Sequence, residues 1–278
     1  MEEADVLDYL GQLPADSVDL VFGSPPYPRA RTYGIGFRLE GEAWVRWMFD
    51  VVLACRRVST GLVVLVIDSP TRGHRWGAEP MLLAADLVRS GVCLRKPAIY
   101  CRRGVPGGGC RDGLKNLWEL CLVVSRGGPL PWADNTAMGR PARNHFGGRF
   151  GPGRRANGQL KPRRVARGYR ANGQPHYTEA YFPPPRANPG NVIYCDVGGH
   201  RMGSLLAHEN EASMPEYLAE FWVRTYCRPA GIVCDPFVGS GTTPAVALKT
   251  GRNFIGCDIR PCQVALTRRR IAEALHQE

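Results

Sequence analysis

Apolar residues along the first half of the chain follow two patterns, one typical of buried strands and one typical of amphipathic helices. An apolar run at residues 18–22, interrupted only by Asp19, and a continuous apolar run at 62–67 predict buried strands, as in a parallel sheet. Helical spacing of apolar residues over 4–13, 42–57 and 79–90 predicts the intervening helices. This alternation of helices and strands indicates the α/β class.

Weaker signals extend the predicted sheet. Runs at 98–101 and 120–124 flank a glycine-rich loop and predict two antiparallel strands at the far edge of the sheet. A further ordered run begins at 191–194. In the helix at 42–57, the Trp and Met stripe that starts at Trp44 and Trp47 is expected to lie in the core.

The sequence pattern at the end of the chain predicts one βαβ unit that follows a helix. Ser213 and Glu216 have the spacing of a capping box, with Ser as N-cap, and predict a helix that runs to Tyr226. A strand at 231–235, a helix ending near Thr250 and a strand at 253–258 follow.

The middle of the chain has a different composition. From Pro129 to about Val192, Gly, Pro, Asn and Arg dominate, and apolar periodicity is lost. The chain has a net charge of +11 with only four lysines, and ten Arg or Lys residues with no acid lie between Asn135 and Thr178. Such an arginine excess favours a polyanionic partner, of which nucleic acid is the default. We therefore predict three parts: residues 1–130, a basic insertion at 131–192, and residues 193–278.

The basic insertion contains a short internal repeat. The sequence Ala-Asn-Gly-Gln occurs at 156–159 and again at 171–174, each time after an arginine. Low-complexity duplication is one explanation. The other is that Asn and Gln, which pair bidentately with adenine, and Arg, which pairs with guanine, are presented on turns near DNA. The spacing leaves both open.

The closing βαβ unit carries a glycine-rich turn. Gly239 and Gly241 let the backbone turn tightly and approach a ligand, while the N-terminus of the next helix offers free N–H groups to a carboxylate or phosphate. Asp258, at the end of the following strand, is placed to accept both hydroxyls of a ribose. Pro244 replaces the third glycine of the dinucleotide fingerprint, which disfavours NAD.

The first strand ends at the tetrapeptide Ser24-Pro25-Pro26-Tyr27. Two successive prolines lack the N–H groups that a ladder needs, so the strand stops there. The strand end then presents a hydroxyl, a rigid backbone and an aromatic ring. In isolation such a tetrapeptide is a common turn fragment, and its interpretation depends on the glycine-rich unit far away in the chain.

Taken together, Ser24-Pro25-Pro26-Tyr27 and Asp235-Pro236-Phe237-x-Gly239-Ser240-Gly241-Thr242-Thr243 closely resemble the motifs of S-adenosylmethionine-dependent DNA amino-methyltransferases. The motif order, tetrapeptide first and cofactor loop last, resembles the β class. The resemblance covers most of 4–125 and 205–270. It implies a Rossmann-like sheet, mostly parallel with an antiparallel edge hairpin matched by Trp118-Glu119, and S-adenosyl-L-methionine as cofactor. It also implies double-stranded DNA as substrate and the basic insertion as target-recognition region.

The resemblance assigns roles to individual residues. Asp5 is expected at the cofactor's adenine and Ser213 at its methionine carboxylate. The remaining cofactor-binding residues are Asp235, Pro236, Phe237, Gly239, Ser240, Gly241, Thr242 and Asp258. The catalytic residues are Ser24, Pro25, Pro26 and Tyr27: the Ser24 side chain and Pro25 carbonyl accept hydrogen bonds from the amine, and Tyr27 stacks on the base. The expected DNA-binding residues are Arg140, Arg154, Arg155, Arg163, Arg164, Arg167 and Arg170.

The target base depends on the first residue of the tetrapeptide. Members with Ser there mostly resemble cytosine-N4 enzymes and members with Asp mostly adenine-N6 enzymes, so Ser24 favours cytosine. The base has to be flipped out of the duplex to reach such a site. Three alternatives stay open: an adenine-N6 enzyme, an RNA substrate, and a DNA-binding protein with a vestigial methyltransferase fold. The basic insertion could equally be a solvated tether that adds only non-specific affinity.

Other residue patterns limit the chemistry. The ten cysteines form no C-x-x-C pair and the histidines no cluster, which predicts reduced, mostly buried thiols and no metal. Pro261-Cys262-Gln263 resembles the nucleophile motif of cytosine-C5 methyltransferases, but it lies at a helix start, so Cys262 is expected to be structural or idle. The acidic N-terminus and the lack of long apolar runs predict a cytoplasmic protein without a membrane partner. A cognate restriction endonuclease and a monomeric or homodimeric state are compatible with the sequence.

Overall fold

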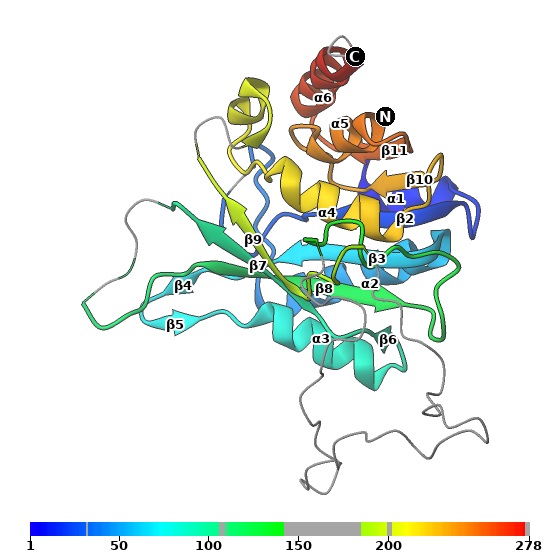
Figure 1. Ribbon diagram of the computed structural model, residues 1–278. Helices are drawn as coiled ribbons and strands as arrows, with labels where there is room; N and C mark the ends of the chain where they lie inside the picture. The colour runs from blue at the N-terminus through cyan, green and yellow to red at the C-terminus, as the bar shows by residue number, and fades with distance from the viewer. Residues whose placement is uncertain (32, 106–108, 110, 142–184, 199–201, 276–278) are drawn as a thin grey trace, which may run out of the picture.

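One mixed sheet, covered by helices on both faces, forms the body of the molecule (Figure 1). The computed structural model describes residues 1–31, 33–105, 109, 111–141, 185–198 and 202–275. In spatial order the strands of the sheet are β1 (Glu2–Glu3), β11 (Asn253–Asp258), β10 (Ile232–Asp235), β2 (Val18–Gly23), β3 (Ser59–Ile67), β8 (Trp118–Ser125), β7 (Ala98–Arg103) and β9 (Val192–Asp196).

Strand direction divides this sheet into two regions. In spatial order, the adjacent strands β1, β11, β10, β2 and β3 run parallel to one another. β3 pairs antiparallel with β8, and β8 pairs antiparallel with β7. The short strand β6 (Cys93–Leu94) also pairs with β8, and β4 (Thr71–Arg72) with β5 (Arg75–Trp76) forms a separate hairpin. The predicted fold, a mostly parallel Rossmann-like sheet with an antiparallel hairpin, is confirmed.

The helices form two layers because the central strands are apolar on both faces. Along β3, Val63 and Leu65 face a core shared with α1 (Val6–Gln12), α2 (Gly41–Val58) and α3 (Glu79–Arg89). Their neighbours Leu62 and Val64 face a second core shared with α4 (Glu216–Tyr226) and α5 (Thr242–Lys249). This period of two explains the continuous apolar runs in the sequence. The last helix, α6 (Pro261–Leu275), packs on α5, and a 3₁₀ turn, η2 (Leu205–Glu209), packs on α6.

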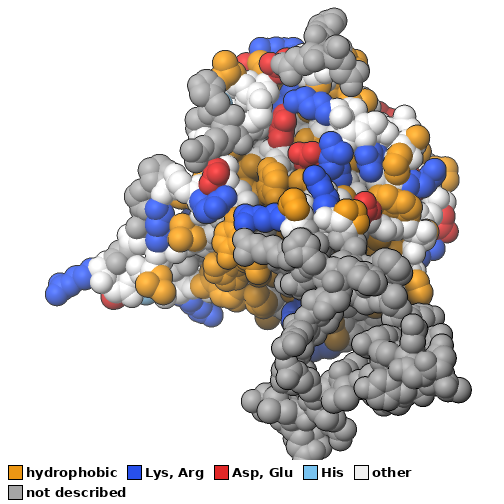
Figure 2. Space-filling view, in the orientation of Figure 1, with side chains coloured by type: hydrophobic (Ala, Val, Ile, Leu, Met, Phe, Trp, Pro, Cys, Tyr) orange, Lys and Arg blue, Asp and Glu red, His pale blue; other side chains and the backbone are white. Residues whose placement is uncertain are grey.

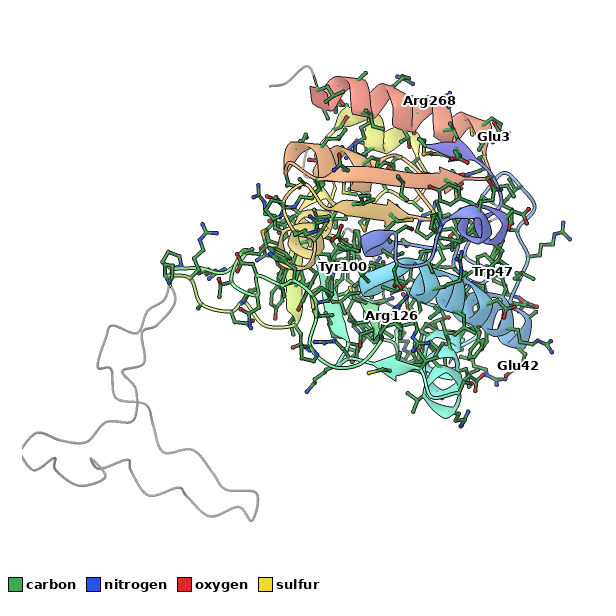
Figure 3. The ribbon with its side chains drawn as sticks, turned by 90° about the vertical axis from the view of Figure 1, so that its right-hand side faces the viewer. Glu3, Glu42, Trp47, Tyr100, Arg126 and Arg268 are labelled. Carbon is green, nitrogen blue, oxygen red and sulfur yellow. The ribbon has the colours of Figure 1, made fainter. Side chains whose placement is uncertain are left out.

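Sheet topology brings the two ends of the sequence together. β2 and β10 are parallel neighbours, with Leu20 opposite Val233 and Val21 opposite Cys234. Since parallel strands end at the same edge of a sheet, the segments that follow Gly23 and Asp235 lie side by side. In Figure 3 the blue segments of the N-terminal half lie next to the orange segments of the C-terminal half.

Two local predictions are wrong, and a third is confirmed. α4 begins at Glu216 with Pro215 in the N-cap position, so Ser213 does not cap it; the Glu216 carboxylate instead accepts from Lys249 and from Arg270. The hairpin of β7 and β8 is not the edge, because β9 pairs with β7 outside it. The predicted core stripe of α2 is confirmed: Trp44 and Met48 are fully buried, and the partly buried Trp47 packs against the same core at the wall of a cavity.

Most of the described cysteines are buried as free thiols. Six of the nine described cysteines are buried and none of the nine forms a disulfide, as predicted. Among the described residues, no helix has the length and apolarity required to cross a bilayer.

Candidate functional site

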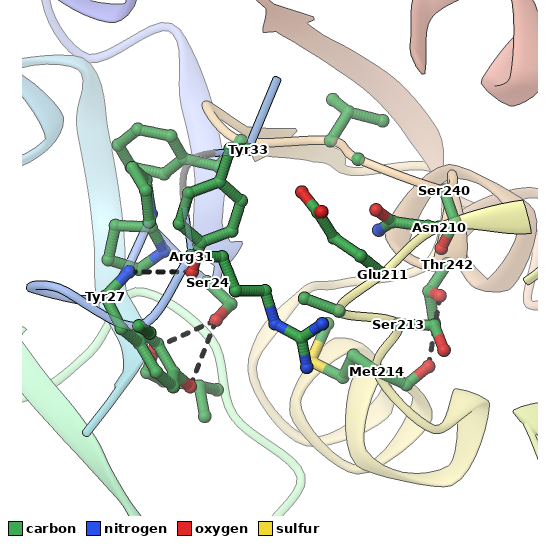
Figure 4. Close-up of a pocket in the computed structure, with 18 of the residues that line it drawn as sticks. Ser24, Tyr27, Arg31, Tyr33, Asn210, Glu211, Ser213, Met214, Ser240 and Thr242 are labelled. Carbon is green, nitrogen blue, oxygen red and sulfur yellow. Dashed lines mark hydrogen bonds between the residues drawn. The ribbon is translucent and has the colours of Figure 1, made fainter. Parts of the chain in front are cut away.

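A cavity of about 1010 Å³ lies at the carboxyl ends of β2, β10 and β11. Figure 4 shows Ser24 and Tyr27 on one wall and Ser213, Met214, Ser240 and Thr242 on the opposite wall, with Arg31 and Glu211 between them. Of the residues assigned from the sequence, the cavity wall includes the four of the tetrapeptide together with Asp5, Ser213, Asp235, Pro236, Phe237, Gly239, Ser240, Thr242 and Asp258. Gly241 does not line the cavity.

The tetrapeptide is held by side chains from several elements. The Ser24 hydroxyl lies 3.1 Å from the Val66 carbonyl and 3.3 Å from the Tyr27 hydroxyl. Trp44 donates from Nε1 to the Pro26 carbonyl at 2.9 Å, which orients the second proline. The Tyr27 backbone N–H donates to the Tyr33 hydroxyl at 3.0 Å. The tip is therefore fixed at both of its ends and at its centre.

At the opposite end of the cavity, Asp235 holds the glycine-rich turn together. Its carboxylate accepts from the Phe237 N–H at 2.9 Å and from the Thr243 hydroxyl at 2.6 Å. The side chain is buried, and burial raises the pKa of Asp235 to about 7, although both donors oppose the shift. Gly241 has a φ of +79° and precedes α5, and a Cβ there would lie 3.1 Å from Thr267. This left-handed conformation is one that glycine adopts without strain.

Two carboxylates flank this turn. Asp258 accepts from the Gly239 N–H at 2.9 Å and from the Arg260 N–H at 2.9 Å, one with each oxygen. Asp5 is the N-cap of α1 and accepts from the Leu7 N–H at 2.8 Å. Each oxygen retains a further lone pair, so both side chains can accept from a ligand in the cavity.

Arg270 is a buried residue behind the cavity wall that the sequence reasoning missed. It is 1% exposed, and its Nη1 donates to the Thr242 hydroxyl at 2.9 Å and to the Ser240 carbonyl at 3.2 Å. The Thr242 hydroxyl donates in turn to the Met214 carbonyl at 3.1 Å. Arg270 therefore joins the glycine-rich turn to the segment that contains Ser213. Its position near the end of α6 gives no local sequence signal.

Glu119 and Arg102 form a second set that was missed as part of the site. Arg102 contacts the Glu119 carboxylate at 3.0 Å, and the Tyr27 hydroxyl donates to the same carboxylate at 2.7 Å. The sequence reasoning noted Glu119 only as part of a hairpin, since nothing in a strand sequence reveals a buried partner that is 92 residues away.

Arg260 links the two ends of the cavity. Its guanidinium donates to the Tyr33 carbonyl at 3.1 Å and to Glu211 at 3.2 Å, and lies 3.5 Å from Asp258. Tyr33 in turn holds the backbone of Tyr27. One cation thus connects the carboxylate at the glycine-rich turn with the segment after the catalytic tetrapeptide.

Two further residues singled out from the sequence, Arg140 and Cys262, do not line this cavity. Arg140 is exposed and does not line it, whereas Arg154, Arg155, Arg163, Arg164, Arg167 and Arg170 lie outside the described residues, as does the Ala-Asn-Gly-Gln repeat. Cys262 is exposed in the first turn of α6. Within the described ranges, no group of three or more His, Cys, Asp or Glu side chains is arranged to hold a metal ion.

The polar groups of the cavity suit a nucleoside that carries an amino-acid tail. Asn210 lines the cavity beside Gly239, and its Oδ1 is buried without a hydrogen-bond partner among the described residues. An unpaired buried acceptor calls for a donor from a ligand. The Asp258 carboxylate can accept from ribose hydroxyls, and the Phe237 ring offers an apolar surface. These residues fit S-adenosyl-L-methionine.

Comparison with known proteins identifies the family. Residues 18–269 match the N6_N4_Mtase model, described as DNA methylase. The chain belongs to this family. Its relatives include the DNA adenine methyltransferase YhdJ of Escherichia coli (strain K12), 28% identical over 98% of this chain and 82% of that protein. The orphan methyltransferase M.BamHII of Bacillus amyloliquefaciens is 24% identical over 94% of this chain and 92% of that protein.

Solved structures share the fold of this DNA methylase family member. The PvuII DNA methyltransferase, which is cytosine-N4-specific, superposes with a TM-score of 0.66 at 18% identity, covering 99% of this chain and 90% of that chain. TTHA0409 from Thermus thermophilus, complexed with S-adenosyl-L-methionine, has a TM-score of 0.58 at 21% identity over 98% and 92%. The resemblance to β-class DNA amino-methyltransferases is thereby confirmed.

Proposed function

We propose that this chain methylates the exocyclic N4 amine of cytosine in DNA. The observation that carries the proposal is the single cavity that joins the tetrapeptide to the glycine-rich turn. S-adenosyl-L-methionine, the cofactor of the family, supplies an electrophilic methyl group when bound. The Ser213, Ser240 and Thr242 end would hold its amino-acid tail, and Asp258 its ribose.

The tetrapeptide has to make a poor nucleophile reactive. The lone pair of an exocyclic amine is delocalised into the base, so the site has to localise it and align it. Ser24 Oγ and the Pro25 carbonyl would each accept one amine hydrogen, which draws the nitrogen towards a tetrahedral geometry. The Pro26 carbonyl is engaged by Trp44 and does not compete for this role. The Tyr27 ring would stack on the flipped base.

The basic insertion at 131–192 would recognise the DNA target, with the arginines named above as its phosphate and base contacts. Adenine-N6 methylation is the second candidate, because YhdJ, an adenine methyltransferase, aligns over 98% of this chain. Ser24 is what favours cytosine, by resemblance to cytosine-N4 enzymes.

The test is incubation of the protein with labelled S-adenosyl-L-methionine and mixed-sequence DNA, followed by nucleoside analysis. We expect label in N4-methylcytosine. Label in N6-methyladenine would overturn the choice of base, and DNA without label would favour a protein that only binds DNA. In a parallel reaction Ser24→Ala should lower the methylation rate by about 100-fold, since one acceptor is lost from the transition state, while cofactor affinity stays unchanged. A Ser24→Ala protein with unchanged turnover would remove Ser24 from the reaction.

A further inference from the structure

A hydrogen-bonded chain of side chains runs beneath the catalytic end of the cavity. Arg102 on β7 lies 3.0 Å from Glu119 Oε1 on β8, and the Tyr27 hydroxyl lies 2.7 Å from Glu119 Oε2. The Tyr27 hydroxyl is also 3.3 Å from Ser24 Oγ. The Glu119 side chain is only 12% exposed, so bulk water contributes little to satisfying it. The chain therefore connects a buried carboxylate to the residue proposed to accept from the target amine.

While Glu119 is ionised, counting protons fixes the direction of the hydrogen bonds between Arg102, Glu119 and Tyr27. An ionised carboxylate only accepts and a guanidinium only donates, so Arg102 and Tyr27 both donate to Glu119. Tyr27 has one hydroxyl proton, and once that proton is directed to Glu119, its oxygen can only accept from Ser24. The single proton of Ser24 then goes either to the Tyr27 oxygen or to the Val66 carbonyl, 3.1 Å away. In both cases neither Tyr27 nor any other donor among the described residues occupies the lone pairs of Ser24 Oγ.

We infer that Glu119 is a positioning residue which, through the Tyr27 hydroxyl, fixes Ser24 as a hydrogen-bond acceptor towards the target amine. The inference rests on the proposed role of Ser24. A neutral group at position 119 loses this effect, because a carboxylic acid or an amide can donate to the Tyr27 oxygen. Tyr27 is then free to donate to Ser24 and to occupy a lone pair that the amine needs.

The groups around Glu119 make its charge sensitive to pH. Burial raises its pKa and nearby Asp68 adds to the rise, whereas Arg102 and the Tyr27 hydroxyl lower it. Tyr100 and Cys121 also face this carboxylate. Burial raises the pKa of Tyr27 well above its usual value, so Tyr27 stays protonated. As pH falls through the pKa of Glu119, the carboxylate takes up a proton and the chain loses its direction.

The test compares Glu119→Gln and Tyr27→Phe with the unaltered protein, measuring kcat for DNA methylation over roughly pH 5 to 9. The unaltered protein should lose kcat on the acid side. Glu119→Gln should have a kcat lower by about 10- to 100-fold, the effect of a lost charge-assisted hydrogen bond, and no acid limb. Its KM for S-adenosyl-L-methionine should stay within about twofold. Tyr27→Phe should lack the acid limb too, and the double variant should be no slower than the slower single variant.

Glu220→Gln is the matched control, because Glu220 pairs with Arg224 on α4 and does not line the cavity. It should keep the unaltered rate and pH profile. Losses that multiply in the double variant, or an acid limb that persists in both single variants, would overturn the inference. If Glu119→Gln does not fold, as judged by its thermal melt, the profile of Tyr27→Phe alone decides. Failure of the proposed function is seen separately, as a lack of labelled DNA with the unaltered protein or full turnover in Ser24→Ala.

Discussion

The two ends of the cavity are held by different means. At the cofactor end, Asp235 bonds to Phe237 and Thr243, two and eight residues further along the chain. At the catalytic end, Ser24 and Tyr27 bond to groups that lie 42 and 92 residues away. A turn stabilised by its own neighbours is encoded in one short motif. A tip stabilised by distant strands depends on the whole sheet, so the two ends should respond differently to substitution.

The largest effect is expected where the two ends touch. A Cβ on Gly23, the last residue of β2, would overlap Asp235 Oδ1, the atom that accepts from the Phe237 N–H. Asp235 is 2% exposed and both of its oxygens accept hydrogen bonds, so a shift that relieves the overlap would break or lengthen one of these bonds. Gly23→Ala should therefore weaken binding of S-adenosyl-L-methionine by about 100-fold through the lost hydrogen bond and overpacking, measured by calorimetry.

The matched control for this change is Gly11→Ala in α1. A Cβ on Gly11 would meet no atom within 4 Å, and the residue is already helical. Alanine is favoured over glycine in a helix by up to about 1 kcal/mol, so this variant should bind the cofactor normally and melt no lower than the unaltered protein. Normal cofactor affinity in Gly23→Ala would mean that the two ends are not coupled through this contact.

The contrast between local and long-range contacts also explains which residues of the site could be predicted from the sequence. The tetrapeptide and the turn from Asp235 to Thr243 were found because each is contiguous, and the apolar runs gave the strands because period and burial are local properties. Arg270 and Glu119 were missed because their partners are brought to them only by the folded sheet. The misplaced capping box has a physical cause too: Glu216 is bonded to Arg270 and Lys249, so it is not free to cap the helix that it begins.

Arg270 tests whether the cofactor end depends on any long-range contact. Its Nη1 donates hydrogen bonds to the Thr242 hydroxyl and the Ser240 carbonyl, and its Nη2 donates to the Glu216 carboxylate at 2.8 Å. Lysine keeps the charge but has no planar fork to make these contacts together. Arg270→Lys should weaken cofactor binding by about tenfold, corresponding to one lost charge-assisted hydrogen bond, with a smaller change in kcat.

The adjacent Arg269 provides the control for that substitution. It pairs with Glu209 by two contacts on the surface, and its side chain is 57% exposed. Figure 2 shows that basic and acidic side chains lie scattered over the face of the molecule in view. Because exposed ion pairs contribute little, Arg269→Lys should leave cofactor affinity unchanged. Equal effects of the two substitutions would mean that Arg270 acts by general charge alone and that the cofactor end is held by its local bonds.

The smallest effect is expected from the contact that orients the second proline. Trp44 is fully buried and its Nε1 donates to the Pro26 carbonyl. Trp44→Phe leaves that carbonyl unpaired and should lower stability by about 1–3 kcal/mol, together with a modest loss of kcat, as measured by denaturant unfolding and by the methylation assay. Trp222 is also buried, at 3% exposure, but its Nε1 has no oxygen or nitrogen partner among the described residues and only the weakly accepting sulfur of Cys121 nearby. Trp222→Phe removes similar volume without breaking a strong hydrogen bond, so it should leave kcat intact. A catalytic end that depends on distant contacts requires Trp44→Phe, and not Trp222→Phe, to slow methylation.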